Sequence, residues 1–141
     1  MVGAQSLSAK ERRFLFVCVQ NSGRSQMAEA FARKYGLKAS SAGTLPADSV
    51  NPVVVKLMKE RGPDISSNRP KLLTKEMIDA ASLVITMGCS VEAVCPRPML
   101  AKMQKKLVDW SLEDPKGKPE PEVREIRDEI ERRVRLLAAE S

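Results

Sequence analysis

Apolar residues along the chain fall into short blocks separated by polar loops. Continuous apolar runs alternate with segments in which apolar residues recur every three or four positions. Residues 13–19 form a nearly continuous apolar run, which is typical of a strand buried on both faces. Three further runs predict strands at residues 37–41, 81–87 and 106–110. We expect the run at 81–87 to be the second central strand of the sheet, beside the first.

Between these runs, apolar residues recur at steps of three and four, which indicates helices that bury one face. The pattern predicts helices at residues 26–36, 51–62 and 75–81, and a loop at residues 111–121. A last helix carries its apolar stripe at Val123, Ile126, Ile130, Val134 and Leu137. Strands that alternate with helices predict a doubly wound three-layer α/β sandwich with a four-stranded parallel sheet.

The length of 141 residues fits a single domain, 1–141, in which residues 1–12 form a loose lead-in to the first strand. This lead-in is polar at its start and has no apolar core, so it does not resemble a secretory signal. No apolar run approaches the roughly 18 residues that a membrane-spanning helix needs. We therefore expect a cytoplasmic monomer that makes no contact with a membrane.

The formal net charge is +6, but residues of both signs are mixed along the chain. The final helix interleaves them at helical spacing, as a solvated face does. Because nucleic-acid binding requires a basic stripe together with a motif, we expect no nucleic-acid partner. A basic balance still favours small anions as ligands.

The chain has three cysteines, Cys18, Cys89 and Cys95, and no histidine. An odd number of cysteines without a secretory signal indicates reduced thiols rather than a disulfide framework. The lack of histidine excludes Ser-His-Asp and Cys-His catalysis, and a zinc site would need ligand spacings that the chain lacks. We expect no metal and no bound cofactor, so a catalytic acid or base has to be Asp, Glu, Lys, Tyr or Cys.

The loop after the first strand has the pattern Cys-x5-Arg-Ser, and a helix follows it at once. Backbone amides that point inward at a helix N-terminus bind a tetrahedral anion, and an arginine fork grips two of its oxygens. The same field favours a thiolate, whose pKa in such sites falls from about 8.5 to roughly 3.5–7.5. We also expect serine hydroxyls of the loop to donate to the sulfur. The expected anion-binding residues are Val19, Gln20, Asn21, Ser22, Gly23, Arg24 and Ser25.

A structural interpretation of this loop remains possible, with Cys18 as a small core residue and Arg24 as a solvated arginine. The positions of the other candidate residues favour a functional interpretation. Cys18, Cys89 and Asp114 each follow a different predicted strand. Because the carboxyl ends of parallel strands meet at one edge of a sheet, we expect the three side chains to share that edge.

Several further motifs recur in a characteristic order. They are CVQNSGRSQMAE in the loop, SAGT at 41–44, NP at 51–52, DIS at 64–66, ITMGC at 85–89 and DP at 114–115. Together they resemble the low-molecular-weight tyrosine phosphatase superfamily, and specifically its thioredoxin-coupled arsenate reductase branch. The resemblance runs from about Arg13 to the final helix, and it is far more specific than the loop alone.

This resemblance implies a relay of three thiols. Cys18 would attack the arsenic of arsenate, which the loop and Arg24 hold, while Asp114 protonates the departing oxygen. Cys89 would then attack Cys18 and release arsenite. Cys95 would pass the oxidation on to thioredoxin or a similar dithiol protein. Phosphate and sulfate would compete as oxyanions, and no bound cofactor is implied.

A phosphatase of the same superfamily is the alternative, because it shares the anion loop and the aspartate. Two features favour the reductase. The segment TMGCSVEAVCP adds two thiols that hydrolysis does not need, although free cysteines are often simply buried. Lys116 follows Pro115, where such phosphatases often have a tyrosine that holds the phenol of the substrate. A non-enzymatic redox sensor is a third hypothesis.

Some members of the superfamily bind potassium beside the loop through Asn, Glu, Ser and Asp side chains. Asn21, Glu29 and Ser41 match three of these positions, but Lys71 stands in place of the aspartate. We predict that the Lys71 ammonium replaces the ion and that activity is insensitive to potassium. Many relatives also carry a cysteine where this chain has Gly23, and its loss would leave the loop more flexible.

Overall fold

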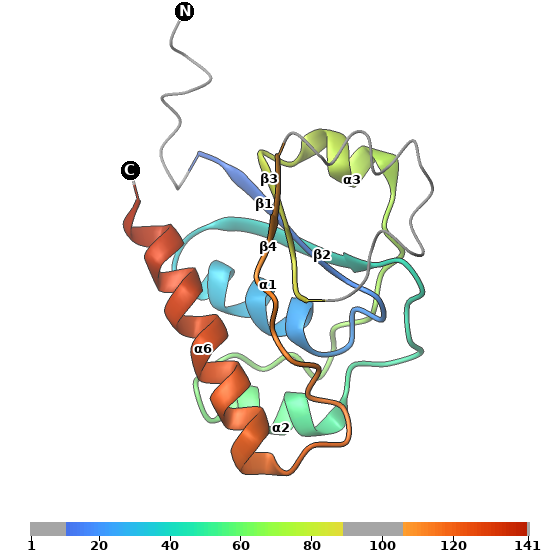
Figure 1. The fold of residues 1–141 in the computed structure, drawn as a ribbon, viewed down its shortest axis with the longest axis vertical. Helices are drawn as coiled ribbons and strands as arrows, with labels where there is room; N and C mark the ends of the chain where they lie inside the picture. Colours follow the sequence, from blue (N-terminus) through green and yellow to red (C-terminus); the bar gives the residue numbers. More distant parts are fainter. Residues whose placement is uncertain (1–10, 89–105, 141) are drawn as a thin grey trace, which may run out of the picture.

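The computed structural model describes residues 11–88 and 106–140. Its sheet consists of β1 (Arg13–Cys18), β2 (Lys38–Gly43), β3 (Leu83–Thr86) and β4 (Leu107–Asp109). The strands lie in the order β2-β1-β3-β4, and every neighbouring pair is parallel (Figure 1). The four-stranded parallel sheet and its two central strands, predicted from the sequence, are therefore confirmed.

Helices cover both faces of the sheet and give the molecule three layers (Figure 1). α1 (Arg24–Lys34), α2 (Pro52–Lys59) and α6 (Glu120–Ala139) lie on one side of the sheet. α3 (Lys75–Ala80) lies on the other side. This arrangement is the doubly wound α/β sandwich that alternating strands and helices predict.

Residues of β1 alternate between the two faces of the sheet, and all but the first are buried. Phe14 and Phe16 pack with the buried faces of α1 and α6, whereas Leu15 and Val17 pack with Ile78 of α3. A strand covered on both faces explains why this run is apolar without interruption. The same cover buries Cys18, the residue at the carboxyl end of the strand.

Several helix ends differ from the prediction. α1 begins at Arg24, two residues early, because the carbonyl of Gly23 already accepts a hydrogen bond from the amide of Met27 at 3.0 Å. α2 ends at Lys59 rather than at residue 62. The amide of Gly62 turns back three residues onto Lys59, and Gly62 takes a left-handed φ of 116°.

The ends of three strands and the start of α6 also differ from the prediction. β2 continues past residue 41 to Gly43 because Gly43 pairs with Cys18 in the sheet. β3 and β4 are each shorter than predicted. α6 begins at Glu120, where the sequence predicts a loop, because a proline in the first turn of a helix loses no helical hydrogen bond. The predicted apolar stripe of α6 is buried from Val123 to Val134.

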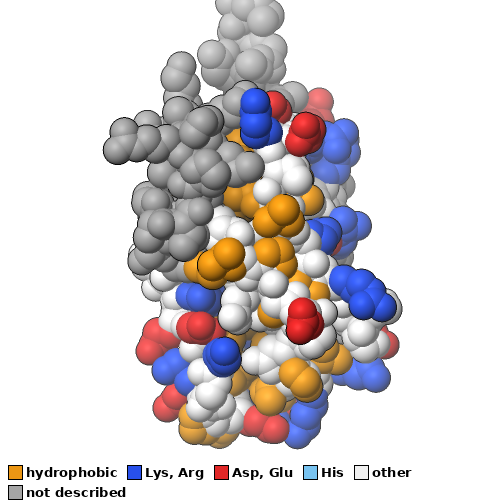
Figure 2. All heavy atoms as spheres, turned by 90° about the vertical axis from the view of Figure 1, so that its right-hand side faces the viewer, with side chains coloured by type: hydrophobic (Ala, Val, Ile, Leu, Met, Phe, Trp, Pro, Cys, Tyr) orange, Lys and Arg blue, Asp and Glu red, His pale blue; other side chains and the backbone are white. Residues whose placement is uncertain are grey.

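Figure 2 shows the side of the molecule that lies to the right in Figure 1, where β2 ends. Hydrophobic side chains gather in the middle of this face, and charged side chains lie mainly toward its edges. Within residues 11–88 and 106–140, no helix is long and apolar enough to span a membrane.

Candidate active site

Cys18, the last residue of β1, is surrounded by the loop that leads into α1, and it is only 4% exposed. Its Sγ accepts a hydrogen bond from the amide of Asn21 at 3.2 Å and lies 2.9 Å from Oγ of Ser25. Because Ser25 Oγ accepts from Nδ2 of Asn21 at 2.8 Å, its own proton is available to the sulfur. Two donors directed at one sulfur stabilise the thiolate over the thiol.

Asn21 holds the loop in shape from beneath and is fully buried. Its φ of 51° is a left-handed backbone conformation, which asparagine tolerates better than most residues. Its Oδ1 accepts from the backbone amide of Lys71 at 2.9 Å and from Nε2 of Gln26 at 3.1 Å. One side chain therefore ties the loop to α1 and to a segment fifty residues away.

The segment after β2 binds the outer side of the loop. The carbonyls of Val19, Gln20 and Ser22 each accept a hydrogen bond from an amide of residues 45–51, at 2.8, 3.0 and 2.9 Å. Because a planar peptide holds its N–H opposite its C=O, the amides that follow these carbonyls face the interior of the loop. Inward-facing amides of this kind are donors for an oxyanion.

Arg24, the first residue of α1, is 8% exposed and connects three segments of the site. Its Nη1 donates to the carbonyl of Met87 and to that of Leu112, both at 2.7 Å. Its Nη2 lies 3.9 Å from Oδ2 of Asp114. These contacts orient the planar guanidinium beside the loop, as bidentate binding of an oxyanion requires.

Asp114 lies at the mouth of the site with a side chain that is 61% exposed, and its Oδ1 accepts from the amide of Lys116 at 3.0 Å. Cys18, Arg24 and Asp114 all line one cavity of about 480 Å³. Val19, Gln20, Ser22, Gly23, Gly88 and Lys116 line it too. The structure thus places the predicted nucleophile, clamp and acid together at the carboxyl edge of the sheet.

Two of the predicted thiols, Cys89 and Cys95, lie outside the described residues. Asn21 and Ser25 are buried beneath the loop, where they support it rather than line the cavity. The carbonyls of Met87 and Leu112, which hold Arg24, are contributors that sequence reasoning missed. A backbone carbonyl is present at every residue, so no residue type could have indicated them.

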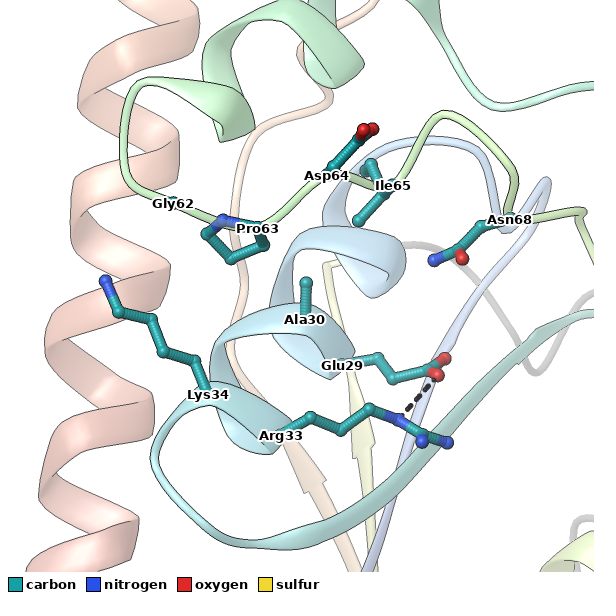
Figure 3. Close-up of a pocket in the computed structure, with 9 residues that line it drawn as sticks. All are labelled: Glu29, Ala30, Arg33, Lys34, Gly62, Pro63, Asp64, Ile65 and Asn68. Atoms are coloured by element: carbon teal, nitrogen blue, oxygen red, sulfur yellow. Dashed lines mark ion pairs between the residues drawn. The ribbon is translucent and has the colours of Figure 1, made fainter.

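Glu29 of α1 lies behind the loop and is surrounded by donors and cations. Its Oε1 accepts from Oγ of Ser41 at 2.5 Å and lies 3.6 Å from Nζ of Lys71. Its Oε2 lies 3.0 Å from Nε of Arg33, beside a cavity of about 750 Å³ between α1 and residues 62–68 (Figure 3). The described residues hold no cluster of three His, Cys, Asp or Glu side chains that could bind a metal. Potassium insensitivity stays a prediction.

Comparisons with known proteins agree with this geometry. Residues 13–141 match the family described as low molecular weight phosphotyrosine protein phosphatase. The arsenate reductase of Brevibacillus brevis is 37% identical over 131 residues, covering 91% of this chain and 95% of that protein.

Two solved structures show the same likeness in three dimensions. The Corynebacterium glutamicum thioredoxin-dependent arsenate reductase is 39% identical with a TM-score of 0.71, covering 96% of this chain and 65% of that one. The YwlE arginine phosphatase from Geobacillus stearothermophilus is 29% identical with a TM-score of 0.79, covering 90% of each chain. The resemblance seen in the sequence is confirmed, and the chain belongs to the low molecular weight phosphotyrosine protein phosphatase family.

Proposed function

We propose that the protein reduces arsenate to arsenite, with Cys18 as the nucleophile. The observation that carries the proposal is the single cavity that the Cys18 thiol, the Arg24 guanidinium and the carboxyl group of Asp114 share. Relatives at 37% and 39% identity over most of this chain are named arsenate reductases, which favours this chemistry for the shared loop.

In the first step, the loop amides and Arg24 hold the oxygens of arsenate. The Cys18 thiolate attacks arsenic and forms a sulfur–arsenic bond, while Asp114 gives its proton to the departing oxygen, which leaves as water. Because Asp114 Oδ2 lies 3.9 Å from Arg24 Nη2, the acid stands beside the group that clamps the anion.

The second step transfers two electrons. The Cys89 thiolate attacks Sγ of Cys18, and the electron pair of the breaking sulfur–arsenic bond reduces arsenic(V) to arsenic(III), which leaves as arsenite. The Cys95 thiolate then attacks Cys89, releasing the Cys18 thiolate and forming a Cys89–Cys95 disulfide. A dithiol protein of the thioredoxin type reduces this disulfide and is itself oxidised. The thioredoxin-dependent relative supports this choice of reductant.

A phosphatase is the second candidate, and the structural likeness to an arginine phosphatase favours it. The same thiolate and acid would break a phosphorus–oxygen or phosphorus–nitrogen bond through a phosphocysteine. Phosphotyrosine is a poor fit, because among the described residues that line the cavity none is an aromatic that could stack on a phenol. In addition, the residue after Pro115 that lines this cavity is Lys116, which is not an aromatic residue.

The test couples the protein to thioredoxin, thioredoxin reductase and NADPH. We expect NADPH oxidation that requires arsenate and is lost in Cys18→Ser. The Cys95→Ser variant should release about one arsenite per enzyme and then stop, because the disulfide cannot be passed on. Peptide mapping should then find a Cys18–Cys89 disulfide in that variant and a Cys89–Cys95 disulfide in the native chain.

Each other outcome selects a different hypothesis. Full multiple turnover by Cys95→Ser would contradict the relay while leaving arsenate reduction intact. Hydrolysis of phosphorylated arginine or an aryl phosphate without arsenate turnover would favour the phosphatase. Turnover of neither class of substrate, together with reversible oxidation of Cys89 and Cys95, would favour the redox sensor.

A further inference from the structure

The carboxylate of Asp109, at the end of β4, gathers hydrogen bonds from two segments that border the active site. Its Oδ1 accepts from Oγ1 of Thr86 at 2.9 Å, from the amide of Gly88 at 3.0 Å and from the amide of Ser111 at 3.3 Å. Its Oδ2 accepts from Oγ of Ser111 at 2.9 Å. Regular pairing of β3 with β4 ends at Thr86 and Asp109, so this side chain continues the connection beyond the sheet.

The two segments that Asp109 joins lie in direct backbone contact. Gly88 has a left-handed φ of 92°, and a Cβ at this position would lie 2.3 Å from the carbonyl oxygen of Leu112. Ser111 also takes a left-handed φ, of 51°. Gly88 adopts its positive φ without strain, but the lack of a Cβ is what allows the two backbones to lie this close. At Ser111 the left-handed conformation is unfavourable, and the hydrogen bonds to Asp109 help to hold it.

Arg24 contacts the same two segments. Its Nη1 binds the carbonyls of Met87 and Leu112, each one residue along the chain from a residue that donates to Asp109. Asp109 and Arg24 thus fasten together the exit of β3 and the loop that carries Asp114.

We propose that Asp109 is a positioning residue of the active site: it holds Gly88 against the 111–114 loop and so sets where Asp114 meets the oxyanion. The expected effect of Asp109 on turnover rests on the proposed function, whereas its effect on the exchange of the Gly88 and Ser111 amides does not. Burial by itself would raise the pKa of Asp109, but hydrogen bonds from Thr86 and Ser111 outweigh burial and hold this pKa below its ordinary value. The carboxylate is therefore ionised at neutral pH, which strengthens each bond that it accepts.

The hydrogen bonds that Asp109 accepts come from Thr86, Gly88 and Ser111, whereas the anion loop is held in place by the 45–51 segment and the amide of Lys71. Arg24 keeps its own hydrogen bonds to the carbonyls of Met87 and Leu112 when the Asp109 carboxylate is removed. The removal should therefore affect the proton transfer by Asp114 more than binding of the anion. This separation between turnover and binding distinguishes a positioning role from a general structural one.

The experiment compares Asp109→Ala with Asp109→Asn, in which Oδ1 still accepts and Nδ2 can donate to Oγ of Ser111. In Asp109→Ala we expect kcat for arsenate to fall about tenfold or more, because small displacements of a catalytic group are costly. The dissociation constant of inorganic phosphate, measured by calorimetry, should stay within about threefold, and exchange of the Gly88 and Ser111 amides should rise about tenfold. Asp109→Asn keeps the acceptor at Oδ1 but loses the charge, so it should change much less than Asp109→Ala in all three measurements. The control Glu125→Ala, at an exposed position of α6, should match the native protein.

An unchanged kcat in Asp109→Ala, an equal loss in Asp109→Asn, or a parallel collapse of phosphate binding would overturn the proposal. If Asp109→Ala does not fold, Ser111→Ala and Thr86→Val each remove one donor and should give smaller losses of the same kind. If the native protein reduces no arsenate, the proposed function is wrong, and amide exchange then decides the positioning role: faster exchange in Asp109→Ala supports it and unchanged exchange refutes it.

Discussion

The backbone of Gly43 lies against the carbonyl of Val19 so closely that a Cβ at residue 43 would sit 2.5 Å from that oxygen. The same Cβ would lie 2.9 Å from the amide nitrogen of Asn21. β2 therefore supports the anion loop by direct backbone contact, and only a residue without a side chain fits at its end.

Replacement of Gly43 by alanine is expected to push the loop outward and to weaken phosphate binding about tenfold or more, since overpacked backbone has to move. Calorimetric titration with inorganic phosphate measures the effect. Gly117→Ala is the control, because no atom lies within 4 Å of a Cβ there and its cost comes from a positive φ alone. Native phosphate affinity in Gly43→Ala would contradict the assigned role of this contact.

The Ser25 hydroxyl donates to the Cys18 sulfur, with the two atoms 2.9 Å apart. Ser25→Ala should therefore slow alkylation of Cys18 by iodoacetamide at neutral pH by about three- to tenfold, in line with the loss of one hydrogen bond to a charged group. Mass mapping of the Cys18 peptide separates this thiol from the other two. Ser67→Ala, an exposed position outside the site, serves as control, and equal alkylation rates in both variants would argue against the bond.

Lys71 places an ammonium 3.6 Å from the Glu29 carboxylate, beside the Ser41 hydroxyl. A fixed cation at this position makes an added one unnecessary, so turnover should change less than about twofold when potassium replaces sodium at constant ionic strength. Lys71→Asp should lose this independence and respond to potassium. A strong potassium response of the native protein would refute the prediction.

Glu60 joins the end of α2 to α6, since it accepts hydrogen bonds from Arg124 at 2.8 Å and from Arg127 at 2.7 Å. These bonds lower the pKa of Glu60 from 4.5 to about 2. A carboxyl group whose pKa is depressed by folding contributes stability above its unfolded pKa, and that stability is lost as the pH falls toward the folded pKa. The melting temperature should therefore drop as the pH falls from about 4.5 to about 2.

Scanning calorimetry across this range checks the expectation. Glu60→Gln should melt only slightly lower than the native protein at neutral pH, because the ion pair is exposed, and its melting temperature should fall less on acidification. Part of the drop should remain, because hydrogen bonds from Arg132 and Arg133 also lower the pKa of Glu129 to about 2. Glu125→Gln, at an exposed position of α6, should follow the native curve, and an identical curve for Glu60→Gln would rule out this contribution.

The architecture and the position of the site could be read from local patterns. The uninterrupted apolar run ending at Cys18 predicts a strand covered on both faces, and alternation with helices predicts a parallel sheet. In such a sheet all carboxyl ends lie on one edge, so Cys18 and Asp114 were expected to meet although 96 positions separate them. Element ends were less predictable, because they depend on hydrogen bonds such as the one between Met27 and Gly23.

The sequence alone thus determined the fold class, the anion loop and the edge at which its chemistry gathers, because hydrophobic periodicity and motif order record local burial and backbone shape. Tertiary structure alone decided how Arg24 is held by two carbonyls and how Asp109 joins Gly88 to Ser111. These contacts join residues from different elements, and their directions depend on the packing of whole elements. No periodicity along the chain specifies such directions.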